Sequence, residues 1–207
     1  MVVKRQYDVS GRQEQAQLKR AAVLDAATSR FLDAGYGATT VAAVAAEAGV
    51  SVETIYKTFG NKAGLVAAIH ERGLAGRGSV SAPHRSDEMQ GRETDPRQVI
   101  RNWGTLTIEV APLVCPILLL IRSAAGTDAD MARLLVDTDK QRLRRMARNA
   151  RTLTGHLRPG VTQREAADIL WTYSSPDLYD LLVIRRQWRL QRYGRFIADA
   201  MIAELLP

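Results

Sequence analysis

Between residues 52 and 59, a short run of polar side chains has the types and spacing to contact a nucleic acid. Residues three and four apart share a face of an α-helix, so Ile55 and Phe59 would point inward. The outward face would then carry Thr54, Lys57 and Thr58, with Val52 and Tyr56 at its edge. Hydroxyl, ammonium and phenol groups donate hydrogen bonds to phosphates and base edges of DNA. A helix with this face is a candidate recognition helix, called the reader helix below, that would contact the bases of DNA.

The preceding residues predict a second helix and a tight turn that would present this face. Thr40 is a suitable N-cap, and apolar residues then recur at helical spacing at Val41, Val44, Ala45 and Ala48. Gly49 can adopt the left-handed conformation that ends a helix, and the Ser51 hydroxyl can cap the next one. The pair of helices favours DNA binding, although an ordinary helical hairpin within a core remains an alternative.

The whole segment resembles the DNA-binding domain of the TetR family of bacterial transcriptional regulators, over Leu18 to about Ile69. The residues that carry the resemblance are Phe31, Gly35-Tyr36, Thr39-Thr40, Val44-Ala45, Ala48-Gly49-Val50-Ser51, Ile55-Tyr56, Phe59, Asn61-Lys62 and Leu65. Thr58 and Gly60 depart from the commoner family pattern, which weakens the expectation of DNA-backbone contacts at these two positions.

The resemblance implies a set of DNA-binding residues: Thr39, Thr40, Ser51, Val52, Glu53, Thr54, Tyr56, Lys57, Thr58 and Lys62. Within this set, Thr40 and Lys62 would contact phosphates and Tyr56 the DNA backbone. The base edges would be approached by Val52, Glu53, Thr54 and Lys57. A carboxylate near phosphates is costly unless it accepts a bond from a cytosine amino group, so Glu53 is a candidate for specificity only.

Composition favours an intracellular globular protein with an anionic partner. The chain has 207 residues, 46% hydrophobic content and a formal net charge of +7. Its single cysteine, Cys115, cannot form an internal disulfide, which fits a reducing cytoplasm. No secretory signal is expected. The longest apolar run, 110–121, is shorter than the ~20 residues of a membrane span and contains two prolines, so no span is expected.

The predicted fold is all-α, with an N-terminal three-helix helix-turn-helix domain and a larger C-terminal helical domain for ligand binding and dimerisation. Residues 1–15 read as a flexible basic arm, which would either enter the minor groove or remain a solvated tail. Residues 16–72 form the DNA-binding domain, and residues 73–96, rich in Gly and Ser, read as a loop or linker. Residues 97–207 form the C-terminal domain.

In the C-terminal domain, helices are expected over 97–110, 128–153, 162–173 and 190–206. The apolar band of the last helix is wider than one core face requires. In the TetR family, two C-terminal helices pair with their copies to form a dimer interface, and the resemblance places this interface on the last two of these helices. The candidate interface residues are Ile169, Tyr173, Phe196, Ile197, Ala200 and Met201. Alternatively, both helices only complete the core of the monomer.

The sequence contains no recognisable catalytic constellation, metal-ligand cluster or cofactor motif, so neither an enzyme nor a cofactor is expected. A ligand pocket among the C-terminal helices is the more plausible second site. Candidate lining residues are Trp103, Thr107, Glu109, Cys115, Met131, Leu135 and Trp171, each of which has core packing as its alternative. Glu109, if buried without a partner, would favour a cationic ligand.

These observations together predict a cytoplasmic, homodimeric transcriptional regulator. It would be a repressor that a small apolar effector releases from a palindromic operator in double-stranded DNA. Two alternatives remain open. The regulator could act without a ligand or under a protein partner, or the chain could be a ligand-binding or enzymatic protein with a vestigial helix-turn-helix.

Overall fold

A computed structural model describes residues 9–207, and every element within that range is helical. The chain divides into two compact units, with the boundary between Ile69 and His70. Of the expected arm, residues 1–8 lie outside the described range. Residues 9–15 already belong to the first helix, so the prediction of a flexible arm is wrong for them.

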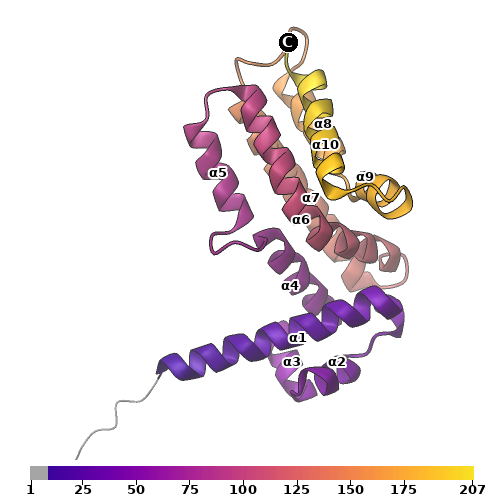
Figure 1. Ribbon diagram of the computed structural model, residues 1–207. Coiled ribbons are helices and arrows are strands. Elements are labelled where there is room, and N and C mark those ends of the chain that lie inside the picture. Colours follow the sequence, from indigo (N-terminus) through magenta and orange to yellow (C-terminus); the bar gives the residue numbers. More distant parts are fainter. Residues whose placement is uncertain (1–8) are drawn as a thin grey trace, which may run out of the picture. The chain divides into compact units, whose positions relative to one another are not determined.

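The first unit consists of four helical segments, drawn in indigo and purple in Figure 1. Helix α1 spans Val9–Ala38, α2 spans Val41–Ala48, α3 spans Val52–Phe59, and α4 spans Lys62–Ala75. The first part of α4, up to Ile69, belongs to this unit. Its core is made of side chains with no exposed surface, among them Phe31, Val44, Ile55 and Leu65.

The boundaries of the helices in the first unit follow the glycine and cap residues. Gly35 has a φ of 80° and a non-helical ψ of 169°, so it interrupts α1. Gly49 has a φ of 65° and a ψ of 34°, the left-handed conformation that ends α2. Between these two glycines, Tyr36 folds back so that its ring stacks on Phe31, with centroids 5.9 Å apart.

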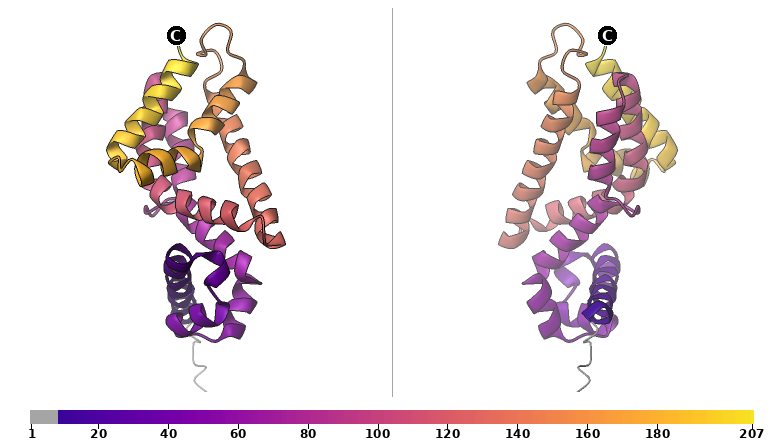
Figure 2. Two further views of the ribbon diagram at one scale, coloured as in Figure 1. Left: turned by 90° about the vertical axis from the view of Figure 1, so that its right-hand side faces the viewer. Right: turned by 90° about the vertical axis from the view of Figure 1, so that its left-hand side faces the viewer.

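The second unit begins with the end of α4 and contains six further helices and a π-helix (Figures 1 and 2). Their bounds are α5 Ala82–Arg92, α6 Pro96–Ala124, α7 Ala129–Thr152, α8 Gln163–Tyr173, α9 Pro176–Tyr179, η1 Asp180–Arg185 and α10 Leu190–Leu205. Helix α6 packs against α5, α7, α9 and α10. Helices α7 and α8 form an antiparallel pair joined by residues 153–162, which Figure 2 shows as a loop.

The interpretation of residues 73–96 as a loop or linker is wrong over most of its length. Helix α4 continues to Ala75, and α5 occupies Ala82–Arg92. The buried face of α5 consists of small residues, Ala82 and Ser86, which gave no apolar periodicity in the sequence. The position of α5 is further stabilised by Asp87, which forms ion pairs with two arginines of α7.

Helix α6 runs unbroken through Pro112 and Pro116, where the sequence predicted a break. Proline lacks the N–H group that bonds to the carbonyl four residues earlier. Spaced four apart, the two prolines remove these bonds along one face. The neighbouring Val114, Cys115 and Ile117 are buried, and their packing holds the helix together. By length and composition α6 could cross a membrane, but it has twelve buried residues and packs as a core helix.

The crossing of α6 and α10 depends on two glycines. Gly104 of α6 and Gly194 of α10 bring the two helix backbones so close that a Cβ on either residue would meet the backbone of the other helix. This close approach lets the large side chains beside it become fully buried: Tyr193 is 2% exposed and Ile197 is 1% exposed.

Candidate nucleic-acid interface and internal cavity

Helix α3 presents the polar face that the sequence predicted. Ile55 is completely buried and anchors the helix in the first unit. The side chains of Thr54, Lys57 and Thr58 are exposed. At the edge of this face, Val52 is 38% exposed and Tyr56 is 50% exposed. Two unpartnered apolar and aromatic surfaces therefore lie beside three donors, which suits contact with thymine methyl groups and the DNA backbone.

Two hydroxyl caps fix the starts of α2 and α3. The Thr40 hydroxyl accepts a hydrogen bond from the backbone N–H of Ala43 at 3.1 Å. The Ser51 hydroxyl accepts one from the N–H of Thr54 at 3.1 Å and lies 2.8 Å from the Thr54 hydroxyl. Each cap satisfies a backbone N–H at a helix start. Ser51 thereby orients Thr54, which is a candidate base contact.

Thr39 does not belong to the exposed face, so its assignment as a DNA contact is wrong. Its side chain is only 3% exposed. Its hydroxyl lies within hydrogen-bond distance of the carbonyl oxygens of Gly35, at 2.8 Å, and Arg30, at 3.0 Å. The Thr39 hydroxyl therefore satisfies carbonyl groups at the end of α1, while its neighbour Thr40 remains exposed. Sequence position alone could not separate these two adjacent threonines.

Lys62 lies at the start of α4, where its ammonium group is 4.1 Å from the centroid of the Tyr36 ring. The start of α4 is capped by Asn61, whose side-chain oxygen accepts from the N–H of Gly64 at 2.7 Å. A Cβ on Gly64 would collide with the carbonyl oxygen of Phe59, so this junction requires glycine. Lys62 is thus held in place by an aromatic ring, in a position open enough to reach a phosphate.

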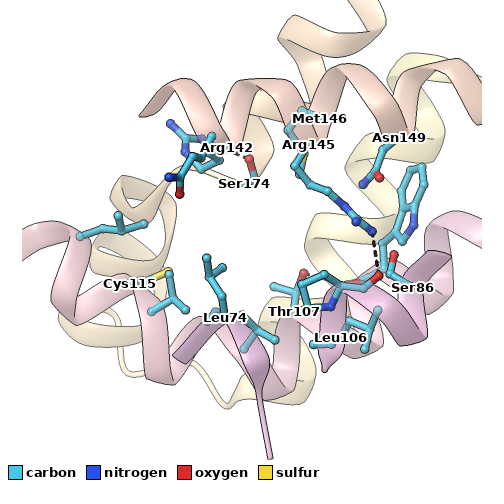
Figure 3. Close-up of a pocket in the computed structure, with 18 of the residues that line it drawn as sticks. Leu74, Ser86, Leu106, Thr107, Cys115, Arg142, Arg145, Met146, Asn149 and Ser174 are labelled. Carbon is cyan, nitrogen blue, oxygen red and sulfur yellow. Dashed lines mark hydrogen bonds between the residues drawn. The ribbon is translucent and has the colours of Figure 1, made fainter. Parts of the chain in front are cut away.

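The second unit contains a cavity of about 390 Å³ that is partly open to solvent and lies within the size range of small-molecule sites. Figure 3 shows that Leu74, Leu106 and Thr107 lie on one side and Met146 on the other. The complete lining is His70, Leu74, Ala82, Pro83, Ser86, Trp103, Leu106, Thr107, Val110, Ala111, Val114, Cys115, Leu118, Thr138, Gln141, Arg142, Arg145, Met146, Arg148, Asn149, Tyr173, Ser174 and Tyr193.

Three of the seven predicted pocket residues line this cavity: Trp103, Thr107 and Cys115. Met131 does not line it, because its side chain is completely buried elsewhere in the packing. Leu135 is half-buried outside the lining. Trp171 is also outside it, and its ring is covered by the Arg142 guanidinium at 4.5 Å. For these three the predicted pocket role is wrong.

Glu109 is also absent from the lining, and it is paired. Its carboxylate accepts a hydrogen bond from the Arg85 guanidinium at 2.6 Å and another from the backbone N–H of Arg77 at 2.7 Å. The hydrogen bond from Arg85, followed by that from Arg77, lowers the pKa of Glu109. The condition under which Glu109 would favour a cationic ligand, burial without a partner, is therefore not met, and its predicted place in the pocket is wrong.

Sequence reasoning missed the polar stripe that α7 contributes to the cavity. Its members are Thr138, Gln141, Arg142, Arg145 and Asn149, which occupy positions i, i+3, i+4, i+7 and i+11. This spacing places them on one helix face. The signal was visible as a polar stripe on a helix that also carries buried residues, but without the fold it resembled a solvated face.

The three arginines of the cavity lining already have partners. Arg145 forms an ion pair with Asp87 at 2.9 Å, and Arg148 forms a second with the same carboxylate at 3.3 Å. Arg142 donates to the carbonyl oxygen of Trp171 and to Ser174, and lies 3.4 Å from Asp139. Burial lowers the pKa of Arg142.

Burial also controls two titratable groups of the lining. It lowers the pKa of His70 to about 4, so the imidazole is neutral at pH 7. It raises the pKa of the Cys115 thiol to about 12, so the thiol stays protonated. In the described part of the chain, no three His, Cys, Asp or Glu side chains form a group that could hold a metal ion. At neutral pH, the lining therefore offers neither a thiolate from Cys115 nor a charged imidazole from His70.

The predicted dimer residues fall into three groups. Ile197 and Met201 are 1% and 5% exposed inside the single chain, so their assignment to an interface is wrong. Tyr173 faces the cavity. Phe196 is 39% exposed, and Ala200 and Ile169 are partly exposed. Only these last three present surface that a second chain could cover.

Comparison with known proteins supports this architecture. The family model for bacterial regulatory proteins of the tetR family matches residues 23–69. A curated protein of Bacillus subtilis (strain 168), named "Uncharacterized HTH-type transcriptional regulator YvkB", is 43% identical over 87 residues. That match covers 42% of this chain and 42% of the length of YvkB.

Several solved structures share the fold along most of the chain. NalD of Pseudomonas aeruginosa, named as the secondary repressor of the MexAB-OprM multidrug efflux pump, has a TM-score of 0.71 and 20% identity, covering 93% of this chain and 98% of NalD. The SmeT–triclosan complex has a TM-score of 0.70 and 22% identity, covering 91% of this chain and 92% of SmeT. A regulator from Saccharomonospora viridis, solved in complex with choline, has a TM-score of 0.67 and 17% identity. The match covers 91% of this chain and 97% of that regulator.

The capped helices α2 and α3 form a helix-turn-helix, and α3 carries the exposed polar face with which such a motif contacts DNA. The family match falls on the same helices as the exposed face. Residues 23–69 therefore match the TetR family of bacterial regulatory proteins, and the chain as a whole shares the fold of solved regulators of that family. The family and the structural relatives are regulators of transcription and not enzymes.

Proposed function

We propose that this chain is a cytoplasmic, homodimeric repressor that binds a palindromic operator and releases it when a small, mainly apolar molecule enters the cavity. One observation carries the proposal. Helix α4 starts at Lys62 in the DNA-binding unit, and its other end contributes His70 and Leu74 to the cavity lining. A ligand against those two residues would act on a helix that continues into the DNA-binding unit.

The proposed DNA contacts are the accessible members of the predicted set. They are Thr40, Ser51, Val52, Glu53, Thr54, Tyr56, Lys57, Thr58 and Lys62. In a two-fold dimer, two copies of α3 would read half-sites about 34–36 Å apart on successive major grooves. A palindromic site is the DNA sequence that matches such symmetry.

The proposed dimer contact uses the outer surfaces of α8 and α10. Phe196, Ala200 and Ile169 supply accessible apolar surface there. The relatives add support for an effector, because SmeT was solved with triclosan and the S. viridis regulator with choline. The proposed coupling is reciprocal: a ligand that weakens operator binding must itself bind more weakly to the operator complex.

The first test is selection of bound sequences from a random pool of DNA duplexes, with the mass of the purified protein measured in solution. The proposal expects a palindromic site bound by a dimer. Operator binding is then titrated in the presence of small apolar compounds. If none of the compounds weakened binding to the selected DNA site, the result would favour the alternative, a regulator that acts constitutively or through a protein partner. Failure to enrich any site would contradict the proposed DNA-binding function.

A further inference from the structure

Two buried polar atoms in the cavity lining have no hydrogen-bond partner among the described residues. They are the indole Nε1–H of Trp103, which is a donor, and the side-chain oxygen of Asn149, which is an acceptor. Both residues are more than nine-tenths buried, with exposures of 7% and 6%. Buried polar groups in proteins are nearly always hydrogen-bonded, so an unpaired donor and an unpaired acceptor in one cavity indicate a missing partner.

The two groups come from different helices that face the same space. Trp103 lies on α6 and Asn149 on α7. Figure 3 places Asn149 and Ser86 towards one end of the cavity, with Arg142 and Ser174 towards the other. The Ser86 hydroxyl already accepts from the Gln90 amide at 2.8 Å. The unpaired groups therefore mark the end of the cavity near Asn149 as a place for a polar ligand atom.

The charges of the lining exclude a cationic ligand. Three arginines and no carboxylate occur among the residues that line the cavity. Each of these arginines already has an acceptor: Asp87 pairs with Arg145 and Arg148, and Arg142 bonds to Asp139, to Ser174 and to the carbonyl oxygen of Trp171. The Asn149 oxygen would also repel a carboxylate. A neutral ligand is the one that this environment accepts at lowest desolvation cost.

We propose that the effector is a neutral amphiphile with a hydroxyl head group, an alcohol or a phenol. Its oxygen accepts a hydrogen bond from Trp103 Nε1–H, and its O–H donates to the Asn149 oxygen. Its apolar body packs against Leu74, Leu106 and Val110. This inference rests on the proposed function, because it names the class of ligand for the same cavity.

The test uses four matched compounds that share one apolar body: 4-pentylphenol, 4-pentylanisole, pentylbenzene and 4-pentylbenzoate. Binding to the full chain is measured by isothermal titration calorimetry in the absence of DNA. We expect the phenol to bind at least about tenfold more tightly than each of the other three, since only a hydroxyl pairs with both groups. Equal affinities, tighter binding of the benzoate or no binding of any compound would overturn the proposal.

Two variants then assign the preference to these side chains. Trp103→Phe and Asn149→Leu each remove one hydrogen-bonding group and keep an apolar side chain. The readout is the ratio of phenol to anisole affinity, which a purely structural role would not change. We expect the ratio to fall to about twofold or less in both variants, while pentylbenzene still binds. A preserved ratio would mean that only water pairs with the two groups, and would overturn the proposal.

Thr107→Val is the matched control for these variants. Thr107 also lines the cavity, but its hydroxyl already donates to the carbonyl oxygen of Trp103 at 2.9 Å. This variant should keep the wild-type ratio.

The outcome for the ligand class is separable from the outcome for the regulator. If the phenol binds with the expected selectivity but does not weaken operator binding, the ligand class holds and the proposed release mechanism fails. If another compound class releases the operator and the phenol does not bind, the regulator holds and this inference fails.

Discussion

A Cβ atom on Gly104 would lie 2.6 Å from the carbonyl oxygen of Gly194, and one on Gly194 would lie 2.7 Å from the carbonyl oxygen of Gly104. The crossing of α6 and α10 is therefore reciprocal, and neither glycine can be enlarged unless the helices separate. We expect Gly104→Ala to lower the free energy of unfolding of the second unit by about 1–3 kcal/mol, the usual cost of overpacking. All three tryptophans lie in this unit, so their fluorescence during chemical unfolding measures it.

Gly91→Ala is the control for this substitution. Gly91 is inside α5, and nothing lies within 4 Å of a Cβ built on it. Alanine has a higher helix propensity than glycine, so this variant should be as stable as the wild type or up to about 1 kcal/mol more stable. If Gly104→Ala behaved in the same way, the close crossing would be contradicted.

A second prediction concerns Thr39, which the structure removes from the DNA-binding face. Thr39→Val keeps the shape of the side chain and removes the hydroxyl that bonds to the carbonyls of Arg30 and Gly35. We expect a loss of about 0.5–1.5 kcal/mol in the stability of the first unit. Because all three tryptophans lie in the second unit, the stability of the first unit is measured from the unfolding transition that circular dichroism detects and tryptophan fluorescence does not. The salt dependence of operator binding should not change. A changed slope of binding affinity against salt concentration would indicate that Thr39 does contact DNA.

A third prediction separates two lysines by their effects on DNA binding. Lys62→Ala should weaken binding to all sequences alike and reduce the salt slope by about one, as expected for a lost phosphate contact. Lys57→Ala, which changes an exposed residue of α3, should relax the base preference at one position of the half-site. Both variants are measured on the selected operator and on its single-base variants. Equal effects from the two changes would contradict the assigned roles.

A fourth prediction concerns the proposed dimer contact on α10. Ala200→Glu places a charge beside Phe196 on the accessible side of the helix, where it would be buried by a second chain. We expect the mass in solution to shift from dimer to monomer and operator affinity to fall by at least about tenfold. Val136→Glu changes an exposed apolar residue of α7, which is outside α8 and α10, and should remain dimeric. A dimeric Ala200→Glu protein would exclude this contact.

A fifth prediction follows from the pKa of His70, which burial lowers from 6.5 to about 4. Because the unfolded chain binds the proton more readily, stability is complete above about pH 6.5 and is lost as the pH falls towards 4. The loss from this group is about 3 kcal/mol. His70→Gln should remove most of this acid-dependent loss. If His70→Gln kept the acid dependence of the wild type, the effect assigned to this buried imidazole would be contradicted.

The reader helix and its turn were predictable because their signals are local. Caps such as Ser51, the left-handed Gly49 and the inward Ile55 need only neighbouring residues to be recognised. Helix α5 was not predictable, since its buried face consists of Ala82 and Ser86, whose burial depends on α6. The sequence also did not predict that α6 continues through Pro112 and Pro116, because packing against other helices maintains the helix there.

The functional sites show the same difference between features with local sequence signals and features that depend on packing between helices. The exposed face of α3 follows from helical periodicity, whereas exposure of Thr39 or Thr40 depends on how α1 ends. The last helix carries two apolar stripes, and the sequence does not say which one faces the core; the stripe with Ile197 and Met201 is the buried one. The cavity required the α7 stripe with Asn149, a residue whose polarity suggested solvent rather than an interior.

The only cysteine of the chain lies in the wall of the cavity, and its thiol is protonated at neutral pH because burial raises its pKa to about 12. Thiolate is the form that peroxides and alkylating reagents attack. Burial and protonation should therefore make Cys115 react slowly with both kinds of reagent. The same inertness makes it a built-in reporter for the experimenter: the slow rate at which a maleimide labels Cys115 measures how often the wall opens, and occupancy of the cavity would slow it further.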